Sequence, residues 1–317
     1  MVAYVPPLPR WLTSLLAPFD SERRSRQPFP AEREDRIEWG RLLPFFAMHA
    51  GCLAVLWVGV SPIAVAVAAA LYLARMFAIT AFLHRCFAHR SFATHRVMRF
   101  LGALVATSSA QRGPLWWVAH HRRHHLESDR DGDAHSPLRR GFWWSHLFWF
   151  MTRRNYRTDH ARVPELTLVP ELRLLDRFDL LVPLGLAALL FGAGEVLAVS
   201  APSLGTDGMQ MLVWGFCVST TALFHATSAV NSLGHTLGSR PFPTRDGSRN
   251  SFWLALLTLG EGWHNNHHWH PASARQGFHW WQVDLTYYLL QMLAACGVVW
   301  DLRPVPARAR AAEGRVA

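Results

Sequence analysis

The sequence predicts an all-α integral membrane protein, with four transmembrane helices in two hairpins and a cytosolic helical cap that carries most of the histidines. Two observations support this fold class. Hydrophobic residues make up 50% of the 317-residue chain, and they gather in separate stretches, as membrane-spanning helices require. The 32 basic residues, all of them arginine, and the 18 histidines lie mostly outside those stretches.

Four apolar stretches are long enough to cross the hydrocarbon core, which takes about 20 residues of helix. They lie at 43–60, 63–83, 179–201 and 209–230. A short turn, Gly59 to Pro62, joins the first pair, and segment 201–208 joins the second pair. The spans should therefore form two hairpins with very little chain exposed between their helices.

A fifth apolar stretch, 98–118, is interrupted by polar and helix-breaking residues from Gln111 to Pro114. We expect it to lie at the membrane interface or to re-enter the membrane without crossing it. Neither hairpin turn contains arginine, whereas cytosolic loops are typically rich in it. The charge pattern thus predicts a multi-pass protein with both termini and the central region in the cytosol, in the inner membrane if the cell is bacterial.

The remaining composition narrows the class of protein. We expect a cytosolic lead-in at 1–42, without a signal peptide, one domain at 43–304 and a short tail at 305–317.

The four cysteines form no C-x-x-C pair, so they predict neither a disulfide framework nor a thiolate metal site. The net charge of +10 comes from arginines that flank apolar stretches. It favours anionic lipid headgroups or a phosphate-bearing substrate over nucleic acid.

Three histidine clusters carry the strongest functional signal. They are the pair His84 and His89, the H-x-x-H-H set His121, His124 and His125, and a second such set, His264, His267 and His268. Residues three and four apart share one face of a helix. The charge pattern also places all three clusters on the same side of the membrane, where they could meet at one pair of metal ions.

Imidazole ligands suit iron, zinc, copper and nickel. Eight histidines exceed the three or four ligands of one zinc site, but they suit two metals at five or six coordination. Two iron ions that activate O₂ are therefore the leading hypothesis. A metal transporter or storage protein is the alternative from another class, and it would place polar residues along a path through its spans. These spans contain almost none.

From about Leu71 to Pro304 the sequence resembles the membrane fatty-acyl desaturases of the stearoyl-CoA (delta-9) type. The resemblance rests on the following strings: Ile79-Thr80 before His84-Arg85, Arg140–His146, Asn231–His235 and Gly260–His268. It implies an oxidoreductase that uses O₂ and two iron ions to form a cis double bond, at the 9,10 position of a saturated C16–C18 chain. Acyl-CoA is the expected carrier. An acyl-lipid or acyl-ACP desaturase, or a related histidine-rich membrane hydroxylase, stays open.

The resemblance also implies roles for residues that spacing does not reveal. His235 would be a ninth metal ligand, and Asn231 would hold a metal-bound water. Gln111, Trp117 and Thr227 match residues that shape a bend in the family's acyl tunnel. Ala119 and His120 stand where acyl-CoA members often have an Arg-Asp pair that helps to hold the CoA part. His120 lies about 100° around the helix from His121, so we expect it not to bind metal.

The closed end of the family's tunnel maps onto Tyr72 and Met76, one helical turn apart. The Met76 side chain should shorten the tunnel and favour chains nearer sixteen carbons than eighteen. Candidate carboxylates behind the metal ligands are Asp129, Asp133 and Glu261, because ligand imidazoles need their second nitrogen held. No fused haem, rubredoxin or ferredoxin pattern is present. We therefore expect a separate electron donor: a ferredoxin, cytochrome b5 or a flavin reductase.

Overall fold

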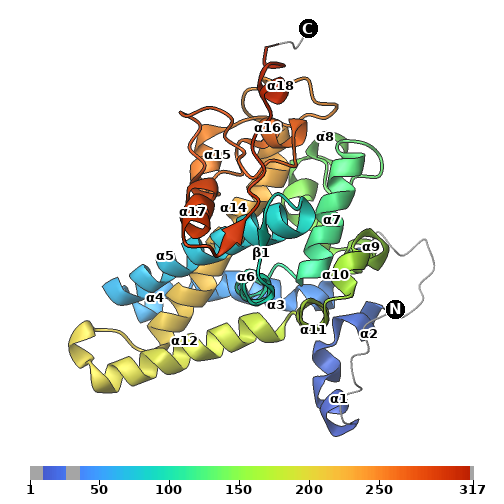
Figure 1. Ribbon diagram of the computed structural model, residues 1–317. Coiled ribbons are helices and arrows are strands. Elements are labelled where there is room, and N and C mark those ends of the chain that lie inside the picture. Colours follow the sequence, from blue (N-terminus) through green and yellow to red (C-terminus); the bar gives the residue numbers. More distant parts are fainter. Residues whose placement is uncertain (1–9, 26–35, 315–317) are drawn as a thin grey trace.

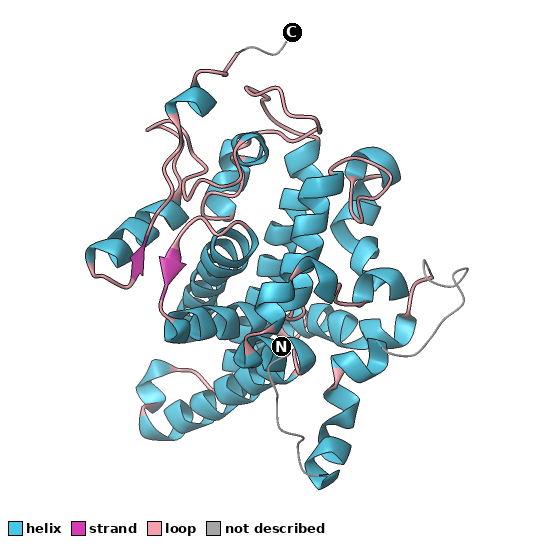
Figure 2. Ribbon diagram, turned by 45° about the vertical axis from the view of Figure 1, so that its right-hand side comes forward, coloured by secondary structure: helices cyan, strands magenta, loops and turns pink. Residues whose placement is uncertain are grey.

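The computed structural model describes residues 10–25 and 36–314, and this part of the chain is helical almost throughout (Figures 1 and 2). Long helices project to one side of a cap built from shorter helices and loops. Two short strands, β1 (Ala93–Thr94) and β2 (Val299–Trp300), pair antiparallel within the cap. This pairing holds the segment around Val299 beside the strand that follows His84 and His89 in the sequence.

The first predicted hairpin begins with an interrupted helix. α3 (Trp39–Cys52) and α4 (Val55–Val58) are separated by a two-residue break. α5 (Pro62–Phe77) follows the expected turn, and its first turn is capped because Ser61 Oγ accepts a hydrogen bond from the Ala64 amide. α5 then continues into η3 (Ala78–Ala88), a π-helical segment, so one rod runs from the turn to the first histidines.

The second predicted hairpin is formed by α12 (Leu181–Ser200) and the helix that follows it. η7 (Pro202–Leu204) makes the turn, and the returning helix consists of four successive parts. These are α13 (Gly208–Gln210), η8 (Met211–Val218), α14 (Ser219–Ser232) and η9 (Leu233–His235). Gly194 lets α12 approach this helix closely, since an added Cβ would lie 2.4 Å from the Asp207 carbonyl oxygen.

Three of these helical stretches are long and apolar enough to cross a membrane: Pro62–Ala88, Leu181–Ser200 and Gly208–His235. Leu42–Val58, which includes the break after α3, is apolar but shorter. The prediction of a helical membrane protein is therefore confirmed. The count of four spans and their arrangement in hairpins stay a prediction.

The fifth apolar stretch forms two separate helices that are both too short to cross a bilayer. α6 (Arg96–Thr107) packs along η3, where the ring of Phe82 occupies the space above Gly102. The chain then turns, and α7 (Pro114–Glu127) begins with a proline in its first turn, a position that proline favours. The break expected between Gln111 and Pro114 thus separates the two helices and directs α7 towards the cap.

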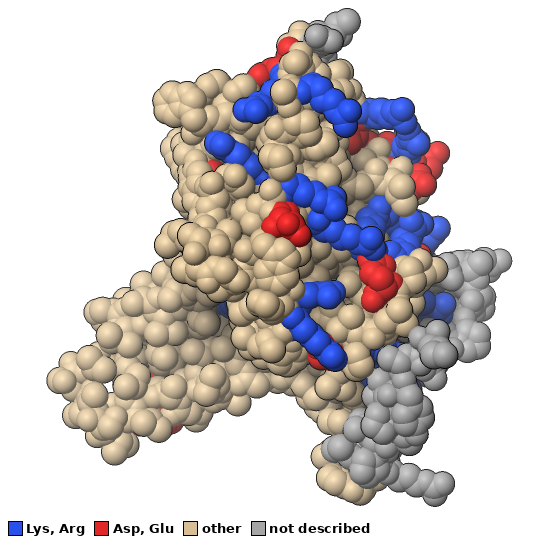
Figure 3. Space-filling view, in the orientation of Figure 1, with Lys and Arg blue, Asp and Glu red and all other residues tan. Residues whose placement is uncertain are grey.

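The rest of the cap consists of short helices. They are α8 (Pro137–Arg140), η4 (Trp144–Phe148), η5 (Trp149–Met151), α9 (Arg153–Tyr156), η6 (His160–Arg162), α10 (Pro164–Thr167), α11 (Pro170–Arg177), α15 (Phe252–Leu257), α16 (His264–Trp269), α17 (Leu285–Ala295) and α18 (Ala307–Arg310). Arginines gather over the cap in Figure 3, whereas the lobe of projecting helices is almost wholly uncharged. This asymmetry is the one on which the predicted orientation depends.

Part of the predicted lead-in is folded against the cap. α1 (Arg10–Leu16), η1 (Ala17–Phe19) and α2 (Ser21–Ser25) precede α3. Asp20 binds Arg177 with an oxygen–nitrogen distance of 2.6 Å, and Ser21 donates to Asp179 at the same distance. Segments 1–9 and 26–35 of the lead-in and 315–317 of the tail lie outside the described residues, and the domain boundaries stay a prediction.

Candidate metal centre

Nine histidines converge where the cap meets the projecting helices, and they divide into two groups. The five-histidine group contains His84, His89, His121, His125 and His267, and the four-histidine group contains His124, His235, His264 and His268. Within each group, one ring nitrogen per residue lies within 4.8 Å of all the others. These are the nine histidines that the sequence analysis singled out.

Two helices contribute to both groups because neighbouring helical residues point about 100° apart. On α7, His121 and His125 enter the five-histidine group, whereas His124 enters the four-histidine group. On α16, His267 turns away from its two partners in the same way. The H-x-x-H-H spacing therefore lets a single helix contribute histidines to two adjacent centres. The sequence analysis expected the histidines to share one metal pair, but it did not predict how they divide between the two centres.

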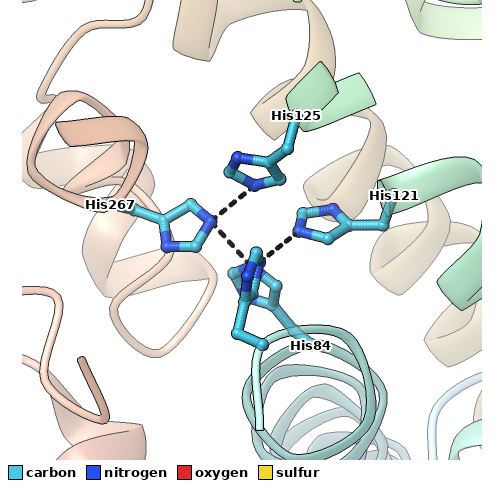
Figure 4. Close-up of side chains that lie close together, drawn as sticks. His84, His121, His125 and His267 are labelled. Carbon is cyan, nitrogen blue, oxygen red and sulfur yellow. Dashed lines mark hydrogen bonds between the residues drawn. The ribbon is translucent and has the colours of Figure 1, made fainter. Parts of the chain in front are cut away.

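The ring nitrogens within each group face one another at short distances. In the five-histidine group, Nε2 of His267 lies 3.0 Å from Nε2 of His84 and 2.9 Å from Nε2 of His125. Figure 4 shows these rings pointing inwards from three separate elements. In the four-histidine group, Nε2 of His235 lies 3.0 Å from Nε2 of His264. The inward-facing atoms are thus nitrogens, with no carboxylate among them.

The three candidate carboxylates lie behind the rings. Nδ1 of His235 donates to Asp129 at 2.8 Å, and Nδ1 of His124 donates to Asp133 at 3.0 Å. Glu261 contacts Nδ1 of His84 in the same manner. A proton held on Nδ1 leaves the lone pair on Nε2. The carboxylates therefore orient these rings with their lone pairs towards the centre of each group.

A fourth carboxylate plays the same part, and the sequence analysis missed it. Nδ1 of His268 donates to Asp246 at 2.7 Å, while its Nε2 is buried without a hydrogen-bond partner among the described residues. Asp246 lies in a loop 22 positions before His268. No helical spacing relates the two, so only the folded loop reveals the contact.

A buried ionic network supports Glu261 in turn. Arg85, next to His84 on η3, is fully buried and pairs with Glu261 at 3.1 Å and with Asp284 at 3.0 Å. Gln276 Nε2 donates to Glu261 at 3.0 Å. The negative charge behind His84 is therefore fixed in place by Arg85 and Gln276, while Asp284 at the N-terminus of α17 holds Arg85.

The donor set fits a pair of metal ions. Burial lowers the pKa of His121, His125, His264 and His267 well below the usual value, and burial also lowers that of His268 to about 4, against the opposing effect of Asp246. Neutral rings present lone pairs, and neutral imidazole is the form that binds metal. A buried nitrogen normally has a binding partner. The unpartnered Nε2 of His268 therefore indicates that a cation or a hydrogen-bond donor binds at the centre of its group.

His120 belongs to neither group. Its ring lies against the indoles of Trp116 and Trp149, with centroids 4.5 and 5.3 Å away. Burial lowers its pKa to about 3. The geometry agrees with the expectation that His120 faces away from the metal ligands on α7.

An apolar cavity of about 520 Å³ ends at this site. Its wall includes His121 and Asn231, together with the three residues expected at the tunnel bend, Gln111, Trp117 and Thr227. Gln111 Nε2 donates to Thr227 Oγ1 at 2.8 Å. The indole of Trp117 stacks on His121 with centroids 5.2 Å apart. An elongated apolar molecule in the cavity would therefore pass directly beside the five-histidine group.

Tyr72 and Met76, the residues expected at the closed end of the tunnel, are not part of this wall. Met76 is fully buried in the main core, and the Tyr72 hydroxyl donates to the Leu257 carbonyl at 2.6 Å. Met76 and Trp117 nevertheless pack in the same core cluster. The role of Met76 in chain length stays a prediction, and it requires the acyl chain to continue beyond the bend.

A helical membrane protein with two histidine groups at the end of an apolar cavity defines a class of membrane-bound, metal-dependent enzymes. Comparison with known families narrows the class, because residues 57–301 match the fatty acid desaturase family. The chain belongs to the fatty acid desaturase family, which confirms the resemblance seen in the sequence.

Individual relatives span more than one type of substrate. The chain is 36% identical to an sn-1 stearoyl-lipid 9-desaturase of Anabaena variabilis over 84% of its own length and 94% of the relative's. It is 34% identical to an sn-2 palmitoyl-lipid 9-desaturase of Nostoc sp. (strain 36), over 68% of its length and 72% of the relative's. It is 37% identical to an acyl-CoA C20 Delta5-desaturase of Anemone leveillei, covering 72% and 70%.

Proposed function

We propose that the protein is an O₂-dependent di-iron desaturase that forms a cis double bond at the 9,10 position of a saturated C16–C18 acyl chain. The observation that carries the proposal is the pair of histidine groups at the inner end of an apolar cavity. The position of the double bond is supported by two relatives that are named 9-desaturases.

In this proposal the five-histidine group holds one iron ion and the four-histidine group holds the other. Asn231 lies in the cavity wall on α14, four residues before His235, so it reaches the site from the same helix. It would complete the smaller group through a water. Iron is preferred to zinc because nine nitrogen ligands suit two ions at high coordination number, whereas zinc sites typically use four ligands.

Bound iron would supply the oxidising power, with O₂, to remove hydrogen from an unactivated carbon, which no protein side chain can do. The protein's residues position the acyl chain and exclude water from the site. Trp117 and the Gln111–Thr227 hydrogen bond shape the wall beside His121, so they select which carbons lie next to the ligands. The carboxylates behind four of the rings keep the Nε2 atoms of those rings directed inwards.

The overall reaction converts –CH₂–CH₂– and O₂, with two electrons and two protons, into –CH=CH– and two waters. The electrons require a separate donor, which we expect to be a ferredoxin, cytochrome b5 or a flavin reductase. Arginines over the cap offer such a partner a basic surface (Figure 3). Acyl-CoA was the carrier expected from the sequence, while the relatives' names include both lipid-linked and CoA-linked chains.

The direct test is expression in a host that lacks its own desaturase, followed by mass spectrometry of the total fatty acids. We expect a new cis-9 monoene of sixteen or eighteen carbons. An alcohol in place of the monoene would identify a histidine-rich hydroxylase. If neither product forms while the purified protein contains iron and an active electron donor is supplied, the proposed function is wrong.

A further inference from the structure

Three histidines outside the two metal groups form a chain of their own. His49 lies on α3, His225 on α14 and His146 on η4, and none of them belongs to either histidine group. Nε2 of His49 lies 3.2 Å from Nε2 of His225, and Nδ1 of His225 lies 3.0 Å from Nε2 of His146. Both nitrogens of His225 are therefore in use, and the contacts run through its ring from one neighbour to the other.

The chain continues to the wall of the cavity through a serine. Nδ1 of His146 lies 2.9 Å from Oγ of Ser232, which is fully buried, and that hydroxyl lies 3.0 Å from the Ser228 carbonyl oxygen. Ser228 and Asn231 line the cavity together with His121. Asn231 precedes Ser232 directly on α14, and it is the residue expected to hold a water at the four-histidine group. The inner end of the chain therefore lies next to the place where that water would bind.

The outer end of the chain is less buried than the inner end. His49 and His225 are half-buried, whereas His146 is buried. Exposed aromatic side chains surround His146: Trp143 is 63% exposed, and the ring of Phe142, also exposed, stacks on the imidazole with centroids 5.2 Å apart. Aromatic residues of this kind are enriched where a membrane meets water. The chain therefore lies at the level of the membrane–water interface, where protons are available.

A count of hydrogens shows that the chain can hold one proton more than its neutral side chains carry. At the outer end, Nδ1 of His49 donates to the Phe45 carbonyl at 2.8 Å. Five contacts thus lead from the Phe45 carbonyl to the Ser228 carbonyl, and each needs one hydrogen. Three neutral imidazoles and one serine hydroxyl supply four. All five hydrogen bonds can form only when the three rings share one additional proton.

The surroundings hold this additional proton weakly. Three phenylalanine rings lie against the chain: Phe45, Phe142 and Phe224. Among the described residues no carboxylate or arginine pairs with the three histidines, and the thiol of Cys52, one turn beyond His49 on α3, donates to Thr221. Burial lowers the pKa of His146, against the opposing effect of a hydrogen bond to the Ser228 carbonyl. Without a carboxylate to retain it, the proton can leave as readily as it arrives.

We propose that this chain of three histidines is a proton relay, which delivers protons through Ser232 to the cavity wall beside the four-histidine group. The inference rests on the proposed desaturase function, whose overall reaction consumes two protons, and it adds the route by which they arrive. The loaded chain carries five hydrogens. When the Ser232 hydroxyl releases a proton to a water at Asn231, each hydrogen behind it shifts by one contact. The vacancy then reaches the half-buried rings, which take up a new proton.

Two substitutions interrupt the relay at different points. His225→Gln keeps a donor and an acceptor at the centre of the chain, but an amide does not pass a proton from one to the other. Ser232→Ala removes the inner hydroxyl and leaves all three histidines in place. Either should lower the rate of monoene formation at pH 8 by about tenfold or more, since proton transfer by a positioned side chain contributes effects of this size or larger. His160→Gln, at a half-buried histidine of η6 outside the chain and both groups, is the matched control and should keep the wild-type rate.

The pH dependence separates a relay from a merely structural role. The rates are measured with iron-loaded, full-length protein in vesicles that contain the acyl substrate and an electron donor. Without the relay, protons must reach the site directly from bulk water, so the variant rates should depend on the proton concentration. The ratio of variant to wild-type rate should therefore rise about tenfold or more from about pH 8 to about pH 6, the range in which histidine chains exchange protons. A ratio that is equally low at both pH values would show lost structure and would overturn the relay.

A second readout does not depend on activity. Full-length protein loaded with zinc, which keeps the nine metal-site histidines from taking up protons, is isotope-labelled at histidine and titrated by NMR. The signals of His49, His225 and His146 are identified by their loss in single glutamine variants. In wild type they should shift together, with one common midpoint, because coupled groups titrate as a unit. In His225→Gln the two remaining rings should titrate separately.

Each outcome decides between the two claims. Wild-type rates in both variants with iron retained, or three independent midpoints in the titration, would overturn the relay and leave the desaturase function standing. No monoene from the wild-type protein with iron and an active donor would overturn the proposed function itself, while the titration would still decide whether the three histidines share a proton. Loss of iron in His225→Gln would transfer the decision to Ser232→Ala and to the titration of wild type.

Discussion

At the residue scale, the contacts behind each ring distinguish the histidines of the two groups from His120. Four of the nine are backed by a buried or half-buried carboxylate, whereas His120 lies against two indoles. Spacing predicted eight of the nine, because i, i+3 and i+4 geometry is local. His235 came only from the resemblance. Asp246 could not be predicted, because a loop brings it to His268.

His235→Ala tests the ninth position. The substitution removes one inward nitrogen from the four-histidine group, so iron content should fall from two ions per chain towards one and monoene formation should be lost. His120→Ala is the matched control, and it should keep two iron ions. Metal analysis of the purified variants by mass spectrometry makes the comparison. Equal iron loss in both variants would remove the distinction drawn between the two residues.

Asp246→Asn tests the carboxylate that only the structure revealed. The amide keeps the shape but no longer holds the proton on His268 Nδ1 by charge, and such changes behind a ligand typically cost about 10–100-fold in metal affinity or activity. The measurement is the rate of iron release to a chelator. Asp131→Asn, at a carboxylate whose side chain is 88% exposed in the same cap, should release iron at the wild-type rate.

At the element scale, hydropathy predicted the long helices and their turns, and polar residues predicted the break between α6 and α7. Two features escaped prediction. The first apolar stretch is interrupted after Cys52, although no proline or charge marks the place. The second feature is that α7 and α16 each contribute histidines to both groups. This division depends on how the two helices face each other, which sequence spacing alone does not define.

Met76 on α5 offers a test of chain-length control. Truncation of this fully buried side chain opens space in the core that also contains Trp117, so Met76→Ala should move the preferred substrate from sixteen carbons towards eighteen. Leu73→Ala, at a position on the same helix that is 51% exposed, should leave the preference unchanged. Competition between C16 and C18 chains in one assay measures it. An unaltered C16 to C18 ratio in Met76→Ala would refute the idea.

At the scale of the whole molecule, charge and hydropathy are segregated along the axis of the projecting helices. Arginines cover the cap, and the turn between α12 and the returning helix contains none. Under the proposed function, this segregation would let an electron donor reach the histidine groups from the basic cap. The sequence predicted the segregation; it could not predict that the cavity would lie between α3 and α12.

Thiol labelling in sealed inverted and right-side-out vesicles tests the predicted orientation. Ser203→Cys places a thiol in the turn after α12, and the native Cys296 is exposed in the cap. A membrane-impermeant reagent should label position 203 only from the outside and Cys296 only from the cytosolic side. Labelling of both thiols from the same side would contradict the orientation inferred from charge.

The central claim is that paired iron in the two histidine groups carries out the desaturation. It is tested most directly by adding Fe²⁺ stepwise to metal-free protein and measuring monoene per chain in a single turnover with O₂ and reductant. We predict little product up to one equivalent of iron and saturation at two. Saturation at one equivalent, or equal product with zinc in place of iron, would contradict the account.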